Sequence, residues 1–264
     1  MPLTVTFDTG VLDDMLWPES AKQPTDPADA TRVRAAVQAG VIQGFFSETL
    51  ITLEGIKNID RAAILSSSRL VSSLSSESKN SITSNVTFQQ DRLPLPHKCV
   101  RRIQAARDLG MRALTVPRSL ADGVCAKDDD GTLFEHPGDL EQFVAKAVHL
   151  RSEIGARDIG SAVAVKLGLQ LSARDGVSEW WYHGLKRAKD IHECRQVERA
   201  VSEWADGDSI AAHYGYGFDL FCSKDFGKGA SGPSVLDCAN RKWLSEEFGI
   251  RFVTLRELAD MVAA

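Results

Sequence analysis

The sequence predicts an α/β fold, a three-layer α/β/α sandwich with a mostly parallel central sheet and an insertion in its middle. Short apolar stretches of strand length alternate with longer stretches of helical spacing along the chain. The composition, 43% hydrophobic and 25% charged over 264 residues, is typical of a globular protein with a sizeable core. Acidic residues also follow two of the expected strands, one near each end of the chain. We therefore expect a single domain over residues 1–264.

Strands and helices are expected to alternate in both halves of the chain. In the first half, strand-length and helically spaced stretches cover residues 3–7, 28–39, 41–46, 97–109 and 112–116. In the second half, they cover 140–154, 191–204, a separate helix opening at Asp208, 219–223, 234–248, 251–254 and a last helix from Leu255. Strands separated by helices in this way favour parallel pairing in one sheet.

The segment after the second expected strand is interpreted as a helix. Ser47 is suited to be its N-cap, and Glu48 stands in its first turn, where the helix dipole favours negative charge. Leu50 and Ile56 mark an apolar side of the same helix. On this interpretation Glu48 and Glu54 belong to one helix.

Two middle regions differ in composition from the rest of the chain. Residues 66–96 are rich in serine and end in a Pro-containing stretch, which predicts an insertion or a mobile loop. The spacing of Ile82, Val86 and Phe88 leaves open a strand-rich excursion instead. Residues 120–190 are expected to form a helical elaboration of the basic fold.

Acidic side chains follow strands at both ends of the chain. Asp8 comes directly after the first strand, and Asp225 stands just past a late one. Because parallel strands end at the same edge of a sheet, these carboxylates are expected to meet there. Clustered carboxylates repel one another unless a cation neutralises them, and oxygen ligands suit Mg²⁺ or Mn²⁺. An N-cap role for Asp8 is an equal alternative.

Four short motifs resemble those of the PIN domain family of Mg²⁺- or Mn²⁺-dependent nucleases. They are Phe7-Asp-Thr-Gly-Val-Leu12, the stretch from Ser47 to Ile56, Asp208-Ser-Ile-Ala-Ala212 and Ser223-Lys-Asp-Phe226. The family pattern is an Asp after strand one, a Glu on an early helix, an Asp at a late helix start and an Asp after the following strand. The resemblance implies catalytic and metal-binding roles for Asp8, Glu54, Asp208 and Asp225.

Two of these positions have competitors in the sequence. Glu48 competes with Glu54 because both are expected on the same helix, and the apolar neighbours of Glu54 favour it. Asp206 competes with Asp208 through a slip of two residues in the alignment. Asp206 and Glu48 are thus further candidate metal ligands.

Several polar residues beside these acids are candidates for substrate binding. Lys224 and Lys228 flank the expected site and could contact phosphate. Thr9 and Ser223 adjoin the acids and could order water or cap backbone groups. The glycine-rich stretch around Lys228 lacks the spacing of a phosphate-binding P-loop, so we interpret it as a loop beside the site.

The resemblance implies a ribonuclease or other nuclease that hydrolyses phosphodiester bonds by metal-ion catalysis. Many members of the family are toxins of toxin–antitoxin pairs. The expected partners are RNA or a single-stranded nucleic acid, an antitoxin or other protein, and a second copy of the chain. This chain is almost twice the usual length of the compact toxins, and its middle region has no counterpart in them.

Two other functions are considered. A PIN-like protein that binds nucleic acid or a protein without cleaving is the alternative, favoured by the net charge of −5. A phosphotransferase of the haloacid dehalogenase type ranks lower, because Gly10 occupies the position of its second Asp. The sequence has no membrane-length apolar run and no signal-peptide pattern at its start, so we expect a cytoplasmic location without membrane contact.

Overall fold

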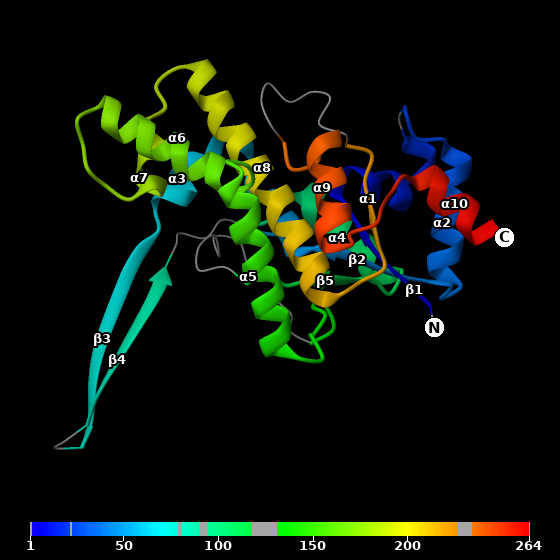
Figure 1. The fold of residues 1–264 in the computed structure, drawn as a ribbon, viewed down its shortest axis with the longest axis horizontal. Coiled ribbons are helices and arrows are strands. Elements are labelled where there is room, and N and C mark those ends of the chain that lie inside the picture. The colour runs from blue at the N-terminus through cyan, green and yellow to red at the C-terminus, as the bar shows by residue number, and fades with distance from the viewer. Residues whose placement is uncertain are drawn as a thin grey trace.

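The computed structural model describes residues 2–21, 23–78, 81–89, 94–117, 131–225 and 234–263 (Figure 1). A parallel sheet of five strands lies at its centre, in the order β5-β2-β1-β6-β7. The strands are β1 (Leu3–Phe7), β2 (Ile42–Ser47), β5 (Arg112–Leu114), β6 (Leu220–Cys222) and β7 (Phe252–Val253). The predicted α/β class with a parallel sheet is confirmed.

The strand order creates a reversal beside the central strand β1. After β1 the chain adds β2 and β5 on one side, and it then returns to add β6 and β7 on the other. Strands β1 and β6 pair in parallel, with Phe7 opposite Cys222. In open parallel sheets, ligand sites form outside the carboxyl ends of strands at such a reversal. This position lies directly beyond Phe7 and Cys222.

Helices cover both faces of the sheet. The helices of the described residues are α1 (Thr9–Leu16), α2 (Pro27–Gln38), α3 (Arg61–Ser66), α4 (His97–Asp108), α5 (Leu140–Ala156), α6 (Ser161–Arg174), α7 (Trp181–Gly184), α8 (Ile191–Tyr216), α9 (Cys238–Phe248) and α10 (Leu255–Ala263). Side chains from α1, α2, α4 and α10 share one buried cluster, and side chains from α5, α8 and α9 share another with Phe221. The alternation of side chains along each strand separates these two layers.

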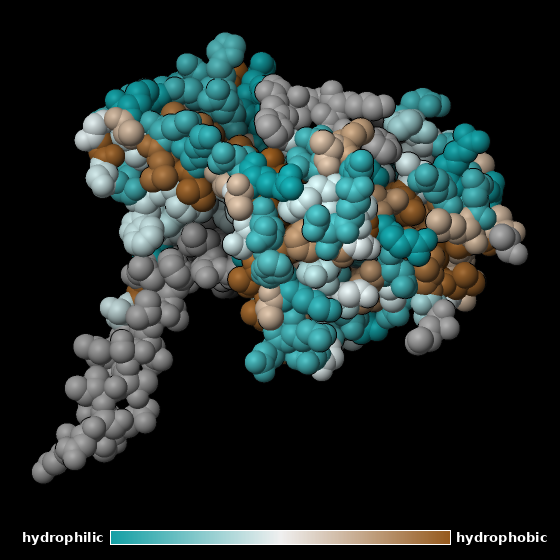
Figure 2. All heavy atoms as spheres, viewed as in Figure 1, coloured by the Kyte–Doolittle hydropathy of each residue, from teal (hydrophilic) through white to brown (hydrophobic). Residues whose placement is uncertain are grey.

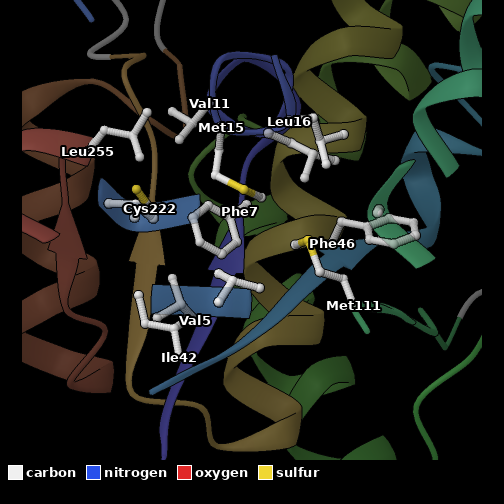
Figure 3. Close-up of a cluster of buried hydrophobic side chains, with 14 of the residues drawn as sticks. Val5, Phe7, Val11, Met15, Leu16, Ile42, Phe46, Met111, Cys222 and Leu255 are labelled. Carbon is white, nitrogen blue, oxygen red and sulfur yellow. The ribbon is translucent and has the colours of Figure 1, made fainter. Parts of the chain in front are cut away.

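The larger core lies between the sheet and the layer that contains α1 (Figure 3). Val5 and Phe7 point from β1 into this layer, where Phe7 lies next to Met15 of α1, and all three are at most 1% exposed. Thr6, between them in sequence, faces the other layer, where its hydroxyl lies 2.9 Å from Nδ1 of His213 on α8. The period of two along β1 therefore anchors a helix layer on each side.

The region expected as a helical elaboration contains α5, α6 and α7 in its described part, residues 131–190. Together with α3, helices α6 and α7 pack on the first half of α8 and form a separate apolar cluster. Trp181 lies edge-on to Trp204 of α8, with ring centroids 5.5 Å apart. This cluster buries one side of the first half of α8.

The Ser-rich region forms a two-stranded antiparallel hairpin, β3 (Arg69–Ser78) and β4 (Ser81–Gln89). The hairpin projects away from the body of the molecule, at the lower left of Figure 1. Within the described residues of this region, the chain therefore forms strands at Arg69–Ser78 and Ser81–Gln89.

The predicted helix with both Glu48 and Glu54 is wrong. A single 3₁₀ turn, η2 (Glu48–Leu50), is followed by turns up to Ile56. The amide of Glu54 donates to the carbonyl of Thr49, five residues back, so the regular α-helical bonding is lost. Gly55 follows, and a Cβ there would stand 2.0 Å from the carbonyl oxygen of Ile51, so the turn needs glycine. Glu48 and Glu54 consequently face different surroundings.

The predicted helix start at Asp208 is also wrong. Helix α8 runs unbroken from Ile191 to Tyr216, and Asp208 lies inside it. The expected gap between the two helices contains Gly207, but a Cβ at this position would come within 3.2 Å of the Cα of Gly160. Glycine thus permits close packing between two segments instead of ending the helix, so tertiary contact outweighs its low helix propensity. Gly217, with φ of 71°, ends the helix.

Candidate acidic site

Asp8 lies at the carboxyl end of β1 and caps helix α1. Its Oδ1 accepts a hydrogen bond of 2.8 Å from the amide of Thr9, and its Oδ2 accepts one of 2.9 Å from the Ser223 hydroxyl. Burial raises the pKa of Asp8, and the charge of Asp225 raises it further, against the lowering effect of these hydrogen bonds. The capping and site roles proposed for Asp8 are therefore compatible.

Ser223 connects the ends of β1 and β6. Its hydroxyl donates to Asp8 and accepts a hydrogen bond of 3.0 Å from the amide of Asp225. Ser223 is fully buried, whereas Asp225 is exposed. One hydroxyl thus orients two acidic residues that are separated by more than 200 positions in the sequence.

Glu54 approaches the same place from the turns after β2. Burial raises the pKa of Glu54, and the negative charge of Asp8 adds to the rise. Glu48 lies elsewhere, where its charge acts on the phenol of Tyr216. The structure therefore brings Glu54, and not Glu48, to Asp8.

Helix α8 contributes Asp206. Burial raises its pKa well above the ordinary value for aspartate, and the charges of Asp8, Glu54, Glu203 and Asp225 each raise it further. Asp206 is the residue on which the charges of the other four acids converge. We call Asp8, Glu54, Glu203, Asp206 and Asp225 the acidic cluster.

Asp208 does not join the acidic cluster. Successive residues of an α-helix are rotated by about 100°, so positions 206 and 208 face nearly opposite directions. Asp208 is 2% exposed and forms an ion pair with Arg151 of α5, at a distance of 2.9 Å between Oδ1 and Nε. A guanidinium thus already compensates the charge of Asp208 within the helix layer.

Glu203 is a member that the sequence analysis missed. It precedes Asp206 by three residues and so shares its side of α8. Its Oε1 accepts hydrogen bonds from the amides of Val235 and Gly160, at 2.6 and 3.3 Å. Burial raises its pKa, and the charge of Asp225 contributes to the rise. The i, i+3 spacing to Asp206 is the signal that could have identified it, once α8 is known to be continuous.

Basic side chains surround the cluster but are paired with other acids. The Lys224 ammonium lies 2.6 Å from Oδ2 of Asp14, and its charge lowers the pKa of Asp8 from a distance. Arg102 forms a bidentate pair with Asp13, with its shorter contacts at 2.5 and 2.6 Å. Lys228, the other predicted phosphate contact, lies outside the described residues.

The donor set of the acidic cluster fits a hard divalent cation in its chemistry. All its potential ligands are carboxylate oxygens, which Mg²⁺ and Mn²⁺ prefer. The negative charges of the other acids raise the pKa of Asp206, so each added negative charge is unfavourable in the acidic cluster. A bound cation would reverse this effect on the pKa. In the part of the chain that the structure describes, no three His, Cys, Asp or Glu side chains already form a metal-holding group.

A pH dependence of stability follows from these pKa shifts. A carboxyl whose pKa is raised on folding binds its proton more tightly in the folded state. Its contribution to stability is present at low pH and is lost as the pH rises above the pKa of the unfolded state. For Glu54 this loss begins near pH 4.5, the ordinary pKa of the group. In metal-free protein, Glu54→Gln is therefore expected to gain stability relative to wild type as pH rises from 4 to 8. Urea unfolding at several pH values measures this difference, and a constant difference would contradict the assignment.

No helix in the described part of the chain is both long enough and apolar enough to cross a membrane. Comparisons of the chain with protein-family models, curated proteins and solved structures gave no match.

Proposed function

We propose that this protein is a metal-dependent ribonuclease that hydrolyses phosphodiester bonds, with Mg²⁺ or Mn²⁺ held by Asp8, Glu54, Asp206 and Asp225. The observation that supports the proposal most strongly is that carboxylates from both ends of the chain, partly buried except for the exposed Asp225, lie near one another at the reversal of the sheet. A fold gains no stability from placing like charges together in a buried position. Such a cluster is expected where a cation has to be bound.

The ion would activate water and stabilise negative charge on the scissile phosphate. The protein's own contribution is orientation. Ser223 and the amide of Thr9 fix both oxygens of Asp8. These hydrogen bonds hold the carboxylate of Asp8 in one orientation before substrate arrives. Glu203 holds the amides of Val235 and Gly160 and so fixes two backbone segments near the site.

Lys224 is the proposed phosphate contact. Its ammonium is paired with Asp14, and the Lys224 side chain keeps 29% of its surface exposed. A flexible ammonium can move from a carboxylate to a phosphate without a change of backbone. Gly10 lies close to the Lys224 side chain. A Cβ added at Gly10 would stand 3.2 Å from the Lys224 Cε. This packing leaves the lysine close to the end of β1.

Cleavage of labelled RNA and single-stranded DNA in Mn²⁺ or Mg²⁺ tests the function. Asp8→Asn and Asp225→Asn are each expected to lower the rate by at least about 100-fold, the upper cost of losing a supporting contact at a metal site. Asp158→Asn is the matched control, because Asp158 is 77% exposed and adopts a positive φ that asparagine tolerates. Cleavage that survives both site substitutions would refute the proposal.

Metal binding can be measured without activity. A ligand that binds only the folded state adds about 2.7 kcal/mol of stability at 100 times its Kd. Mn²⁺ is therefore expected to raise the Tm of wild type and of Asp158→Asn, but much less that of Asp8→Asn. Removal of the ion with a chelator should reverse the rise. An equal rise in all three proteins would place the ion outside the acidic cluster.

A PIN-like protein that binds nucleic acid or a protein without cleaving is the second candidate. Its protein-binding form is favoured by the net charge of −5, which weakens attraction to RNA. Metal binding by wild type without cleavage of any RNA or DNA would select this candidate.

A further inference from the structure

Arg61, the first residue of α3, is a buried arginine that pairs with no acid among the residues that the structure describes. It is 6% exposed, and its guanidinium donates only to two backbone carbonyls and one hydroxyl. Arg102, which is also buried, instead forms a bidentate pair with Asp13. A buried charge is costly unless it is paired and hydrogen-bonded, so the charge of Arg61 calls for a role of its own.

The guanidinium of Arg61 joins two separate segments of the chain. Its Nε donates to the carbonyl of Ile56, at 3.4 Å, in the turns that follow β2. Its Nη1 donates to the carbonyl of Glu198, at 2.9 Å, and to the hydroxyl of Ser202, at 3.2 Å, both on helix α8. Because the two nitrogens belong to one rigid planar group, Arg61 constrains the separation between the turns and the helix.

Both attachment points lie beside proposed metal ligands. Ile56 follows Glu54 by two residues. Ser202 and Asp206 are four residues apart on α8 and therefore share one side of the helix. Burial lowers the pKa of Arg61, and the negative charge of Glu54 opposes this effect, so these two side chains are near one another. Arg61 thus connects the segment that carries Glu54 to the side of α8 that carries Asp206.

The segment that carries Glu54 depends on such attachments, because it is not a regular helix. After η2 the chain continues in turns, and the amide of Glu54 donates to the carbonyl of Thr49. The Thr49 hydroxyl lies 2.9 Å from the hydroxyl of Ser209, which attaches the start of the segment to α8. Arg61 attaches its end to the same helix. Glu54 therefore stands between two points of attachment to α8.

We propose that Arg61 is a positioning residue for the metal site, and that its guanidinium sets the separation between the carboxylates of Glu54 and Asp206. This inference rests on the proposed function, since it requires both acids to bind the ion. Arg61→Lys keeps the positive charge but replaces the planar fork by a single nitrogen, which cannot hold both segments at the same separation. Mn²⁺ binding is expected to weaken by about 10–100-fold, the usual effect of losing a group that orients a metal ligand.

Calorimetric titration of metal-free protein with Mn²⁺ measures this affinity without any need for activity. Circular dichroism verifies that each variant is folded at the temperature of the titration. Asp208→Asn is the matched control for loss of stability, because it removes a different charged contact of α8, outside the acidic cluster. Its Kd for Mn²⁺ should equal that of wild type. Ser202→Ala removes one acceptor of Arg61 and should weaken binding by a smaller factor than Arg61→Lys does.

The sign of a second substitution separates positioning from a simple effect of charge. Arg61→Met removes a positive charge beside the site, so a purely electrostatic role predicts tighter binding of Mn²⁺. A positioning role predicts weaker binding. An unchanged or tighter Kd in either folded Arg61 variant would overturn the inference. Should both variants fail to fold, Ser202→Ala decides by the same criterion.

Failure of the inference is distinguishable from failure of the proposed function. If Asp8→Asn abolishes Mn²⁺ binding and folded Arg61→Lys binds like wild type, the metal site stands and the role of Arg61 is refuted. Wild type that binds no Mn²⁺ would refute the proposed function, and the positioning role of Arg61 with it.

Discussion

Asp206→Asn is expected to abolish RNA hydrolysis and, at the same time, to stabilise the metal-free protein. The first effect follows from removal of the carboxylate on which the charges of the acidic cluster converge. The second follows from electrostatics, because a neutral amide of nearly the same shape avoids repulsion from Asp8, Glu54, Glu203 and Asp225. The gain should be roughly 0.5–2 kcal/mol, the usual range of single stabilising substitutions.

Chemical unfolding at pH 7 in the presence of a chelator measures the stability effect. Excess Mn²⁺ should reduce the difference, because the ion stabilises wild type more than the variant. A purely structural role for Asp206 predicts the opposite sign, namely that Asp206→Asn is less stable than wild type with or without metal. Loss of activity together with loss of stability would therefore remove Asp206 from the proposed site.

Asp208→Asn, the same chemical change two residues away, is expected to have the opposite result. It removes the buried charge of Asp208 and leaves the Arg151 guanidinium without its ion-pair partner. Loss of one partner of a buried ion pair costs about 2–5 kcal/mol, and the partial exposure of Arg151 favours the lower part of this range. The fraction of protein that stays folded should cleave RNA at the wild-type rate.

Thermal and urea unfolding give the stability of Asp208→Asn, and activity per folded molecule gives its effect on the site. The double variant Arg151→Met, Asp208→Leu serves as the control. Replacing both members of a buried pair by apolar residues is often neutral or stabilising, so much of the lost stability should return. If Asp208→Asn kept full stability but lost cleavage, Asp208 rather than Asp206 would belong to the site.

Much of the sheet could be predicted from local patterns. The strand at β1 is short and apolar, and Asp8 follows it with the geometry of an N-cap. The parallel arrangement could also be anticipated, because helices separate successive strands of the sheet. Once both acids are placed after parallel strands, the proximity of Asp8 and Asp225 follows from topology, and the Ser223 hydroxyl bonds both the Asp8 carboxylate and the Asp225 amide.

The remaining members of the cluster depended on packing that the sequence does not reveal. Gly55 and the irregular bonding at Glu54 turn the chain after β2, and this separates Glu54 from Glu48. Glu203 has no distinctive neighbours in the sequence, and only its position one turn before Asp206 places it beside the other acids. Each of these placements depends on backbone geometry rather than on residue type.

The amino-acid sequence by itself determined which segments become parallel strands and that acids stand at the ends of two of them, because alternation and capping are properties of neighbouring residues. Only the tertiary structure decided between Asp206 and Asp208. Close contact between Gly207 and Gly160 allows α8 to continue as one helix, and a rotation of about 100° per residue then turns Asp206 towards the sheet edge and Asp208 towards Arg151. A pattern in the sequence cannot supply that rotation, since it depends on where a helix of 26 residues rests against the rest of the protein.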